Sequence, residues 1–148
     1  MVKVEASVVI KAPRKEVYSW FSKLENLTKY EKTVWKSIKI RKSEGNIVTA
    51  LQEGIISGKA ARGTFKYSCF PPEKIEFVWS EATYGNVTFK EQPISWVFSE
   101  VPEGTKVSMW IPAAVPCIGK VLGPDGETKL KSIMLEELKK MKTTIEKS

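Results

Sequence analysis

The sequence contains no histidine, and its 148 residues include only two cysteines, Cys69 and Cys117. Without histidine, any catalytic triad, general base or metal site that depends on imidazole is excluded. The two cysteines lie far apart and lack the spacing of metal ligands, which argues against a zinc site. Glycine-rich phosphate-binding motifs of the GxGxxG or P-loop type are also missing. We therefore expect neither a metal nor another cofactor.

Long apolar stretches are absent as well. No run is long enough to form a membrane-spanning helix, and the first residues contain no apolar core of a signal peptide. Disulfides are rare in the cytoplasm, so both cysteines would stay reduced there. The sequence thus predicts a cytoplasmic protein that is not exported and does not insert stably into a membrane.

Positive charge exceeds negative charge, with 24 Lys and Arg residues against 17 Asp and Glu residues and a net charge of +7. A basic surface of this kind can bind nucleic acid or an anionic membrane surface. The lysines are scattered, however, and the densest group, at residues 36–42, has no interleaved aromatic residues that could stack on bases. We interpret the excess as a solvated basic surface and expect no nucleic-acid partner.

Hydrophobic residues make up 42% of the chain, enough for a substantial core in one domain that spans residues 1–148. Turn-forming residues recur at regular intervals after residue 43, and the stretches between them are rich in β-branched and aromatic residues. Short connections between successive strands favour an antiparallel meander. The predicted strands cover residues 4–10, 35–41, 47–56, 64–69, 74–80, 87–101 and 105–111.

Three helical segments complete the prediction. Pro13 suits the first turn of a helix, in which Trp20 and Phe21 follow at helical spacing. A short second piece is expected at residues 26–30. A long amphipathic helix begins near Asp125, which is a suitable N-cap. Its apolar stripe comprises Leu130, Ile133, Met134, Leu138, Met141 and Ile145.

Alternation along the strands places many aromatic residues on one face. Between residues 87 and 101 the alternation changes from odd to even positions near Pro93, which predicts a bulge at residues 91–93. The same parity puts Trp35 and Trp110 on the opposite face. The aromatic face could simply fill a core, as such stripes commonly do, or it could line a pocket.

The order of strand, two short helices, antiparallel strands and long C-terminal helix resembles the START and Bet v 1-like (SRPBCC) superfamily, in particular its polyketide cyclase-like branch. Residues 9–21, a strand followed by a proline and a helix with an aromatic pair, resemble its opening signature. Residues 25–30 resemble its next short helix, residues 102–107 its late hairpin, and residues 135–146 its helical end. The resemblance covers nearly the whole chain.

This resemblance implies an α+β helix-grip fold, in which a curved antiparallel β-sheet wraps around the long C-terminal α-helix and two short helices follow the first strand. It also implies a cavity for a small hydrophobic or amphipathic molecule such as a lipid, quinone or polyketide. With that fold, the aromatic and Met residues favour a pocket over a filled core. The predicted cavity wall comprises Phe65, Tyr67, Phe77, Trp79, Trp96, Phe98, Met109, Leu130, Met134 and Leu138, with Glu81 and Glu91 as candidates for a polar rim.

Binding, with transport or sequestration of the ligand, is the leading interpretation. The resembling family has no universal catalytic residue to transfer, so no catalytic residue is assigned. One alternative is a small cyclase or hydratase, which an inward Tyr67–Glu81 pair would favour. Another is a protein-interaction module with an apolar groove. We further expect residues 111–122 and the turn at residues 84–86 to form the cavity mouth, and the protein to be a monomer or a weak homodimer.

Overall fold

The computed structural model describes residues 3–30, 34–112 and 125–147. Its elements follow the predicted order, and the second short helix is a 3-10 helix that begins two residues earlier than expected. The first three elements are β1 (Lys3–Ile10), α1 (Arg14–Ser22) and η1 (Leu24–Thr28). They are followed by β2 (Trp35–Glu44), β3 (Ile47–Ile56), β4 (Lys59–Phe70), β5 (Lys74–Tyr84), β6 (Val87–Val101), β7 (Gly104–Pro112) and α3 (Gly126–Lys147).

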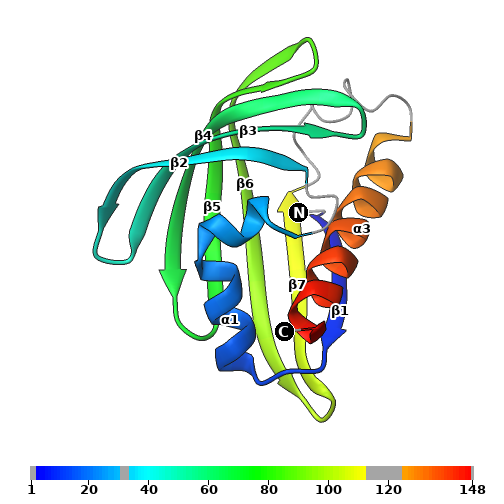
Figure 1. Ribbon diagram of the computed structural model, residues 1–148. Coiled ribbons are helices and arrows are strands. Elements are labelled where there is room, and N and C mark those ends of the chain that lie inside the picture. Colours follow the sequence, from blue (N-terminus) through cyan, green and yellow to red (C-terminus); the bar gives the residue numbers. More distant parts are fainter. Residues whose placement is uncertain (1–2, 31–33, 113–124, 148) are drawn as a thin grey trace.

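The seven strands of the described residues form one sheet in the order β1-β7-β6-β5-β4-β3-β2, and every neighbouring pair is antiparallel. Strands β2 to β7 form a meander because short turns connect them, whereas β1 joins the sheet beside β7. Figure 1 shows the sheet curving so that α1 and α3 lie on its concave side. This arrangement confirms the predicted helix-grip fold. No helix among the described residues is long and apolar enough to cross a membrane.

Aromatic contacts fix α1 against the sheet. The carbonyl of Pro13 accepts hydrogen bonds from the backbone N–H groups of Glu16 (3.0 Å) and Val17 (3.1 Å), which starts the helix. Tyr18 and Phe21 then pack edge-on against Phe98 of β6, with ring centroids 5.3 and 5.2 Å away. One end of the concave face is therefore filled by α1 itself.

Helix α3 packs along β1 and buries Met134, Leu138, Met141 and Ile145, which belong to the predicted apolar stripe. It begins at Gly126, and the carbonyl of Asp125 accepts a hydrogen bond from the backbone N–H of Lys129 at 2.9 Å. The helix thus starts where the sequence predicts.

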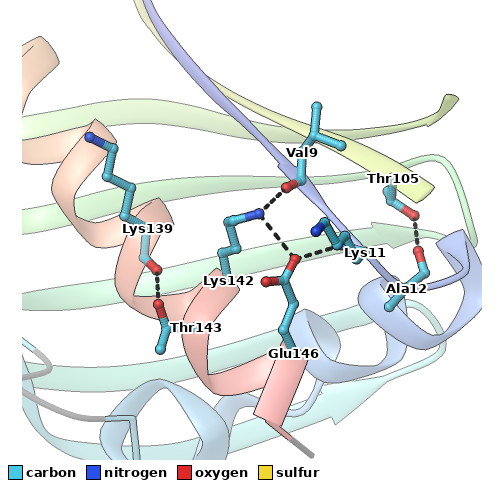
Figure 2. A network of polar contacts seen from close by, with 8 residues as sticks. All are labelled: Val9, Lys11, Ala12, Thr105, Lys139, Lys142, Thr143 and Glu146. Carbon is cyan, nitrogen blue, oxygen red and sulfur yellow. Dashed lines mark hydrogen bonds and ion pairs between the residues drawn. The ribbon is translucent and has the colours of Figure 1, made fainter. Parts of the chain in front are cut away.

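The C-terminal end of α3 is tied to strand β1 (Figure 2). Lys142 Nζ donates to the carbonyl of Val9 at 2.6 Å, and Glu146 Oε2 accepts from the backbone N–H of Lys11 at 2.7 Å. Lys142 and Glu146 also pair with each other at 3.0 Å. Because β1 lies at the end of the strand order, the helix supplies partners for backbone groups at a sheet edge.

Strand β2 lies at the other end of the strand order. Its exposed cationic residues are Lys36, Lys39, Arg41 and Lys42, which we call the basic edge. Charged side chains, lysine above all, are a common protection of edge strands against pairing with another chain. The densest cationic group of the sequence thus lies on an edge strand.

Register shifts in the sheet differ from the predicted bulge. Strands β5 and β6 pair in one register from Lys74 opposite Val97 to Tyr84 opposite Val87, so the predicted bulge at residues 91–93 is wrong. The shift lies instead between β4 and β5, and Glu81 has a positive φ of 47°. A residue in that conformation turns the strand. The positions that face the concave side therefore change parity at this point in both β5 and β6.

Candidate functional site

A cavity of about 120 Å³ lies between the concave face of the sheet, η1 and α3. Nine of the ten residues predicted for its wall do line it: Phe65, Tyr67, Phe77, Trp79, Trp96, Met109, Leu130, Met134 and Leu138. The lining also contains residues that the sequence did not single out, among them Leu27, Tyr30, Trp35, Tyr84, Gln92 and Glu137. Strand alternation and the helical stripe therefore suffice to locate most of the apolar wall.

The sheet contributes a continuous aromatic wall. Cross-strand pairing sets Phe65 opposite Trp79 and Tyr67 opposite Phe77, so their rings come together on one face. Phe65 stacks on Trp79 with ring centroids 5.4 Å apart and on Tyr67 at 6.1 Å. Trp96 lies 4.6 Å from Phe77 across the next strand pair. These contacts hold large rings in fixed positions around the cavity.

The Trp79 indole lies directly over Gly63 of β4. Its Nε1–H donates to the carbonyl of Arg62 at 2.9 Å. A Cβ atom at Gly63 would come within 2.2 Å of that nitrogen and within 2.8 Å of the Ser80 carbonyl oxygen. Glycine is therefore required here by a close approach, since any side chain would push the ring away from the strand.

Trp35 lies on the cavity side, so its predicted place on the opposite face is wrong. A register shift in β2 between Trp35 and Ser37 reverses the side to which Trp35 points. Its ring packs edge-on against Phe65 at 5.0 Å and against Trp79 at 6.2 Å. Trp110, which was assigned to the same opposite face, is half-buried and does not line the cavity.

Three predicted site residues lie elsewhere. Phe98 is buried but belongs to the contact with α1, because Phe21 and Tyr18 cover it before it can reach the cavity. Glu81 is exposed, because its positive φ takes it off the inward parity, and Ala82 takes the buried position after it. Glu91 is also exposed and points away from the wall, whereas its neighbour Gln92 lines the cavity.

The hydroxyl of Tyr67 is already engaged. It donates a hydrogen bond to Gln52 Oε1, and both side chains are almost fully buried. Burial raises the pKa of Tyr67 strongly, and the bond to Gln52 acts in the opposite direction. Tyr67 therefore stays a neutral phenol. It faces an amide rather than the carboxylate of Glu81, so the Tyr67–Glu81 pair that would favour an enzyme does not form.

Two polar atoms of β6 have no hydrogen-bond partner among the described residues. Gln92 is 1% exposed, and its Nε2 donates to the carbonyl of Pro93 at 3.0 Å, but its Oε1 is unpaired. The indole N–H of Trp96 is unpaired too. Both residues line the cavity and lie four positions apart on the inward face of the strand. Buried polar groups without partners are uncommon and call for an explanation.

A carboxylate lies in the wall on the helix side. Glu137 of α3 lines the cavity, and its two oxygens are held by the hydroxyl of Tyr30 and by Lys140 Nζ, the latter at 3.0 Å. Among the described lining residues it is the only one with a charged side chain. The sequence carried a signal for it, because Glu137 falls four residues after Ile133 and three after Met134, inside the apolar stripe.

The described residues provide no metal site, and they include only part of the predicted cavity mouth. They contain no group of three or more metal-ligating side chains. Tyr84 and Ile111, the first residues of the two segments predicted to form the mouth, line the cavity. Most of the predicted mouth segment, residues 113–122 with Cys117, lies outside the part of the chain that the structure describes.

Comparisons with solved structures confirm the fold. TTHA0849 from Thermus thermophilus is 23% identical with a TM-score of 0.72, and the match covers 99% of this chain and 95% of that one. The Zhui aromatase/cyclase from Streptomyces sp. R1128 is 12% identical with a TM-score of 0.72, covering 98% and 93%. Ara h 8.0201 is 14% identical with a TM-score of 0.70, covering 99% of both chains.

Sequence comparison adds a family. No curated protein matches the sequence. A family model described as polyketide cyclase / dehydrase and lipid transport matches residues 1–146. This match agrees with the predicted relationship to the SRPBCC superfamily and its polyketide cyclase-like branch. The chain therefore belongs to the polyketide cyclase / dehydrase and lipid transport family.

Proposed function

We propose that the protein binds a small hydrophobic or amphipathic molecule in the cavity between the sheet and α3. The observation that carries this proposal is the cavity itself, whose wall combines stacked aromatic rings with Met109, Met134 and Met141. Burial of apolar ligand surface supplies about 25 cal/mol per Å², less the cost of association. The family description and the aromatase/cyclase among the structural relatives support the same class of ligand.

The volume bears on the kind of ligand. As it stands, a cavity of about 120 Å³ is too small for a segment of polypeptide. A lipid, quinone or polyketide would need more space than this. Methionine side chains are flexible and repack easily, so Met109, Met134 and Met141 are the residues that would move to admit a larger molecule.

Identification of a co-purifying molecule tests the proposal. Freshly purified protein would be examined by native mass spectrometry, and an organic extract would be analysed in parallel. We expect an adduct of a single apolar compound, which the extract identifies. We also expect the tryptophan fluorescence to change when that compound is added back, because Trp35, Trp79 and Trp96 line the cavity. Protein that carries no adduct and responds to no apolar compound would contradict the proposal.

A second candidate function is a reaction on the bound molecule. It is favoured by the Tyr30–Glu137 contact, which places a carboxylate and a hydroxyl in an apolar wall. Such a pair can transfer protons as general acid and base, the step that a dehydration or cyclisation needs. The names of the structural relatives and of the family point to the same class of reaction.

The variant Glu137→Gln separates the two functions. It keeps a side chain of the same size that can still bond to Tyr30, but it cannot take up a proton. The extracted compound would be incubated with the wild type and the variant, and product masses would be compared. Turnover in the wild type alone supports an enzyme, whereas a compound that returns unchanged from both proteins leaves binding as the function.

A further inference from the structure

The cavity, as it stands, has the size of one aromatic ring. Its volume is about 120 Å³, and an engineered apolar protein cavity of about 150 Å³ binds benzene. Benzene, with six heavy atoms, is thus near the upper limit of the space as it stands, and a ring with a substituent needs small shifts of the flexible side chains in the wall. This makes single-ring compounds suitable probes of what the wall recognises, whatever larger molecule it can admit.

Most polar groups of the wall are already satisfied from within the protein. The hydroxyls of Tyr67, Tyr84 and Tyr30 donate to Gln52, to the carbonyl of Ile56 and to Glu137, respectively. The indole N–H of Trp79 donates to the carbonyl of Arg62. Two polar atoms of the described lining residues remain without a partner: Oε1 of Gln92 and the N–H of Trp96.

The orientation of the Gln92 amide is fixed by its neighbour. Its Nε2 donates to the carbonyl of Pro93 at 3.0 Å. Turning the amide around would set its oxygen against that carbonyl oxygen, so the observed orientation is the favourable one. The group left over is thus a hydrogen-bond acceptor, and a ligand must bring a donor to satisfy it. A carboxylate or another anion brings none, and its burial in an apolar wall is costly.

We propose that Gln92 Oε1 is the polar subsite of this cavity and selects neutral ligands that carry a hydroxyl group on an aromatic ring. The ring packs against the aromatic wall while the hydroxyl donates to Gln92. The proposal rests on the proposed binding function and adds a ligand chemistry to it.

Three probes of nearly equal size test the subsite. Phenol has a hydroxyl donor, toluene replaces the hydroxyl by a methyl group, and anisole keeps the oxygen but loses the donor. Their dissociation constants would be measured by calorimetry for the wild type, for Gln92→Met and for Glu91→Gln. Met has the length of Gln without its carbonyl. Glu91 is the exposed neighbour on the other face and serves as the matched control.

We expect phenol to bind the wild type about tenfold more tightly than toluene or anisole, the effect of one satisfied buried acceptor. The preference should disappear in Gln92→Met and persist in Glu91→Gln. Each comparison is a ratio of dissociation constants measured on the same protein, so a loss of stability in a variant does not obscure it. The wild-type series alone already tests the preference for phenol.

Equal affinities of the three probes in the wild type, or a phenol preference that survives in Gln92→Met, would overturn the subsite and leave the binding function intact. Failure of all three probes to bind would also overturn it. The adduct measured by native mass spectrometry then shows independently whether the binding function fails as well.

Discussion

Trp96 and Phe98 occupy successive inward positions of β6, yet only Trp96 reaches the cavity. Trp96 packs against Phe77, lies 5.0 Å from Phe21 and is one of the residues that line the cavity. Phe98 is enclosed by Tyr18 and Phe21. Two neighbouring side chains on the same face of one strand therefore have different roles: Trp96 lines the cavity, and Phe98 packs against α1.

The substitutions Trp96→Ala and Phe98→Ala should separate these tasks. Truncation of a fully packed aromatic residue costs about 3–5 kcal/mol, and we expect this for Phe98→Ala. Trp96→Ala should cost about 3 kcal/mol or less, because part of the ring borders empty space. Only Trp96→Ala should weaken the binding of toluene. Denaturant unfolding and calorimetry of both variants provide the measurement, and equal losses of binding would contradict it.

Gly63 offers a second test at this scale. In Gly63→Ala the new methyl group collides with the Trp79 indole, so we expect a loss of about 1–3 kcal/mol from overpacking and a changed tryptophan emission. Gly45→Ala is the control. Gly45 has a positive φ of 58° but nothing within 4 Å of a Cβ, so it should cost about 1 kcal/mol through backbone strain alone. An unchanged emission in Gly63→Ala would show that Trp79 does not rest on this glycine.

The elements were largely predictable from the sequence because period-two and helical patterns repeat over many residues. The errors lie where a strand breaks its own period. Trp35 was assigned to the wrong face because of the register shift in β2, and Glu81 because of its positive φ. Sequence alternation carries no marker for such a bulge when no glycine occupies it. The change of parity in β6 is real, but it was explained by a bulge near Pro93, whereas β5 and β6 keep one register there.

The polar part of the site was less predictable, because it depends on residues distant in sequence. Tyr30 and Glu137 are 107 positions apart, and Tyr67 and Gln52 come from neighbouring strands. Nothing local to either partner indicates such a pair. Only the sequence position of Glu137 inside an apolar stripe gave a hint, since a charged residue there must find a partner or face a cavity.

The attachment of α3 to β1 predicts a pH dependence at the scale of elements. Hydrogen bonds from Lys11 N–H and Lys142 hold the pKa of the Glu146 carboxyl below its ordinary value of 4.5. A carboxyl with a lowered pKa in the folded state stabilises the protein above its ordinary pKa and loses that effect as the pH falls through the lowered value. The attachment should therefore weaken below about pH 4.5.

Comparison of the wild type with Glu146→Gln measures this effect. Unfolding free energies would be determined from pH 7 down to pH 3. We expect the wild type to be more stable at pH 7 and the difference to shrink as the pH falls below about 4.5. Glu146 lies at the protein surface, so the difference should be small and should decrease with salt. A difference that stays constant over the whole range would contradict the role of the charge.

At the scale of the whole molecule, an occupied cavity should stabilise the fold. A ligand that binds only the folded state raises the free energy of unfolding by about 2.7 kcal/mol at a concentration of 100 times its dissociation constant. Phenol and toluene should therefore raise the unfolding midpoint in proportion to the logarithm of their concentration. Thermal or urea unfolding at several probe concentrations provides the measurement.

Ile133→Phe is the matching control, because Ile133 lines the cavity from α3 and is only half-buried. The larger ring should occupy the space that the ligand uses. Cavity filling commonly stabilises by about 0.5–2 kcal/mol, so the variant without ligand should be at least as stable as the wild type. Its response to phenol should be reduced. An undiminished response would mean that the probes bind elsewhere.

The basic edge on β2 has a consequence for how copies of the protein meet in solution. Two such strands pairing edge to edge would come within about 4.8 Å of each other and bring like charges together. At 0.15 M salt, charges are felt over about 8 Å, but at 1 M over only about 3 Å. Self-association should thus be suppressed at physiological salt and increase in concentrated salt, which light scattering would detect. We therefore expect these cations to govern the colloidal behaviour of the protein.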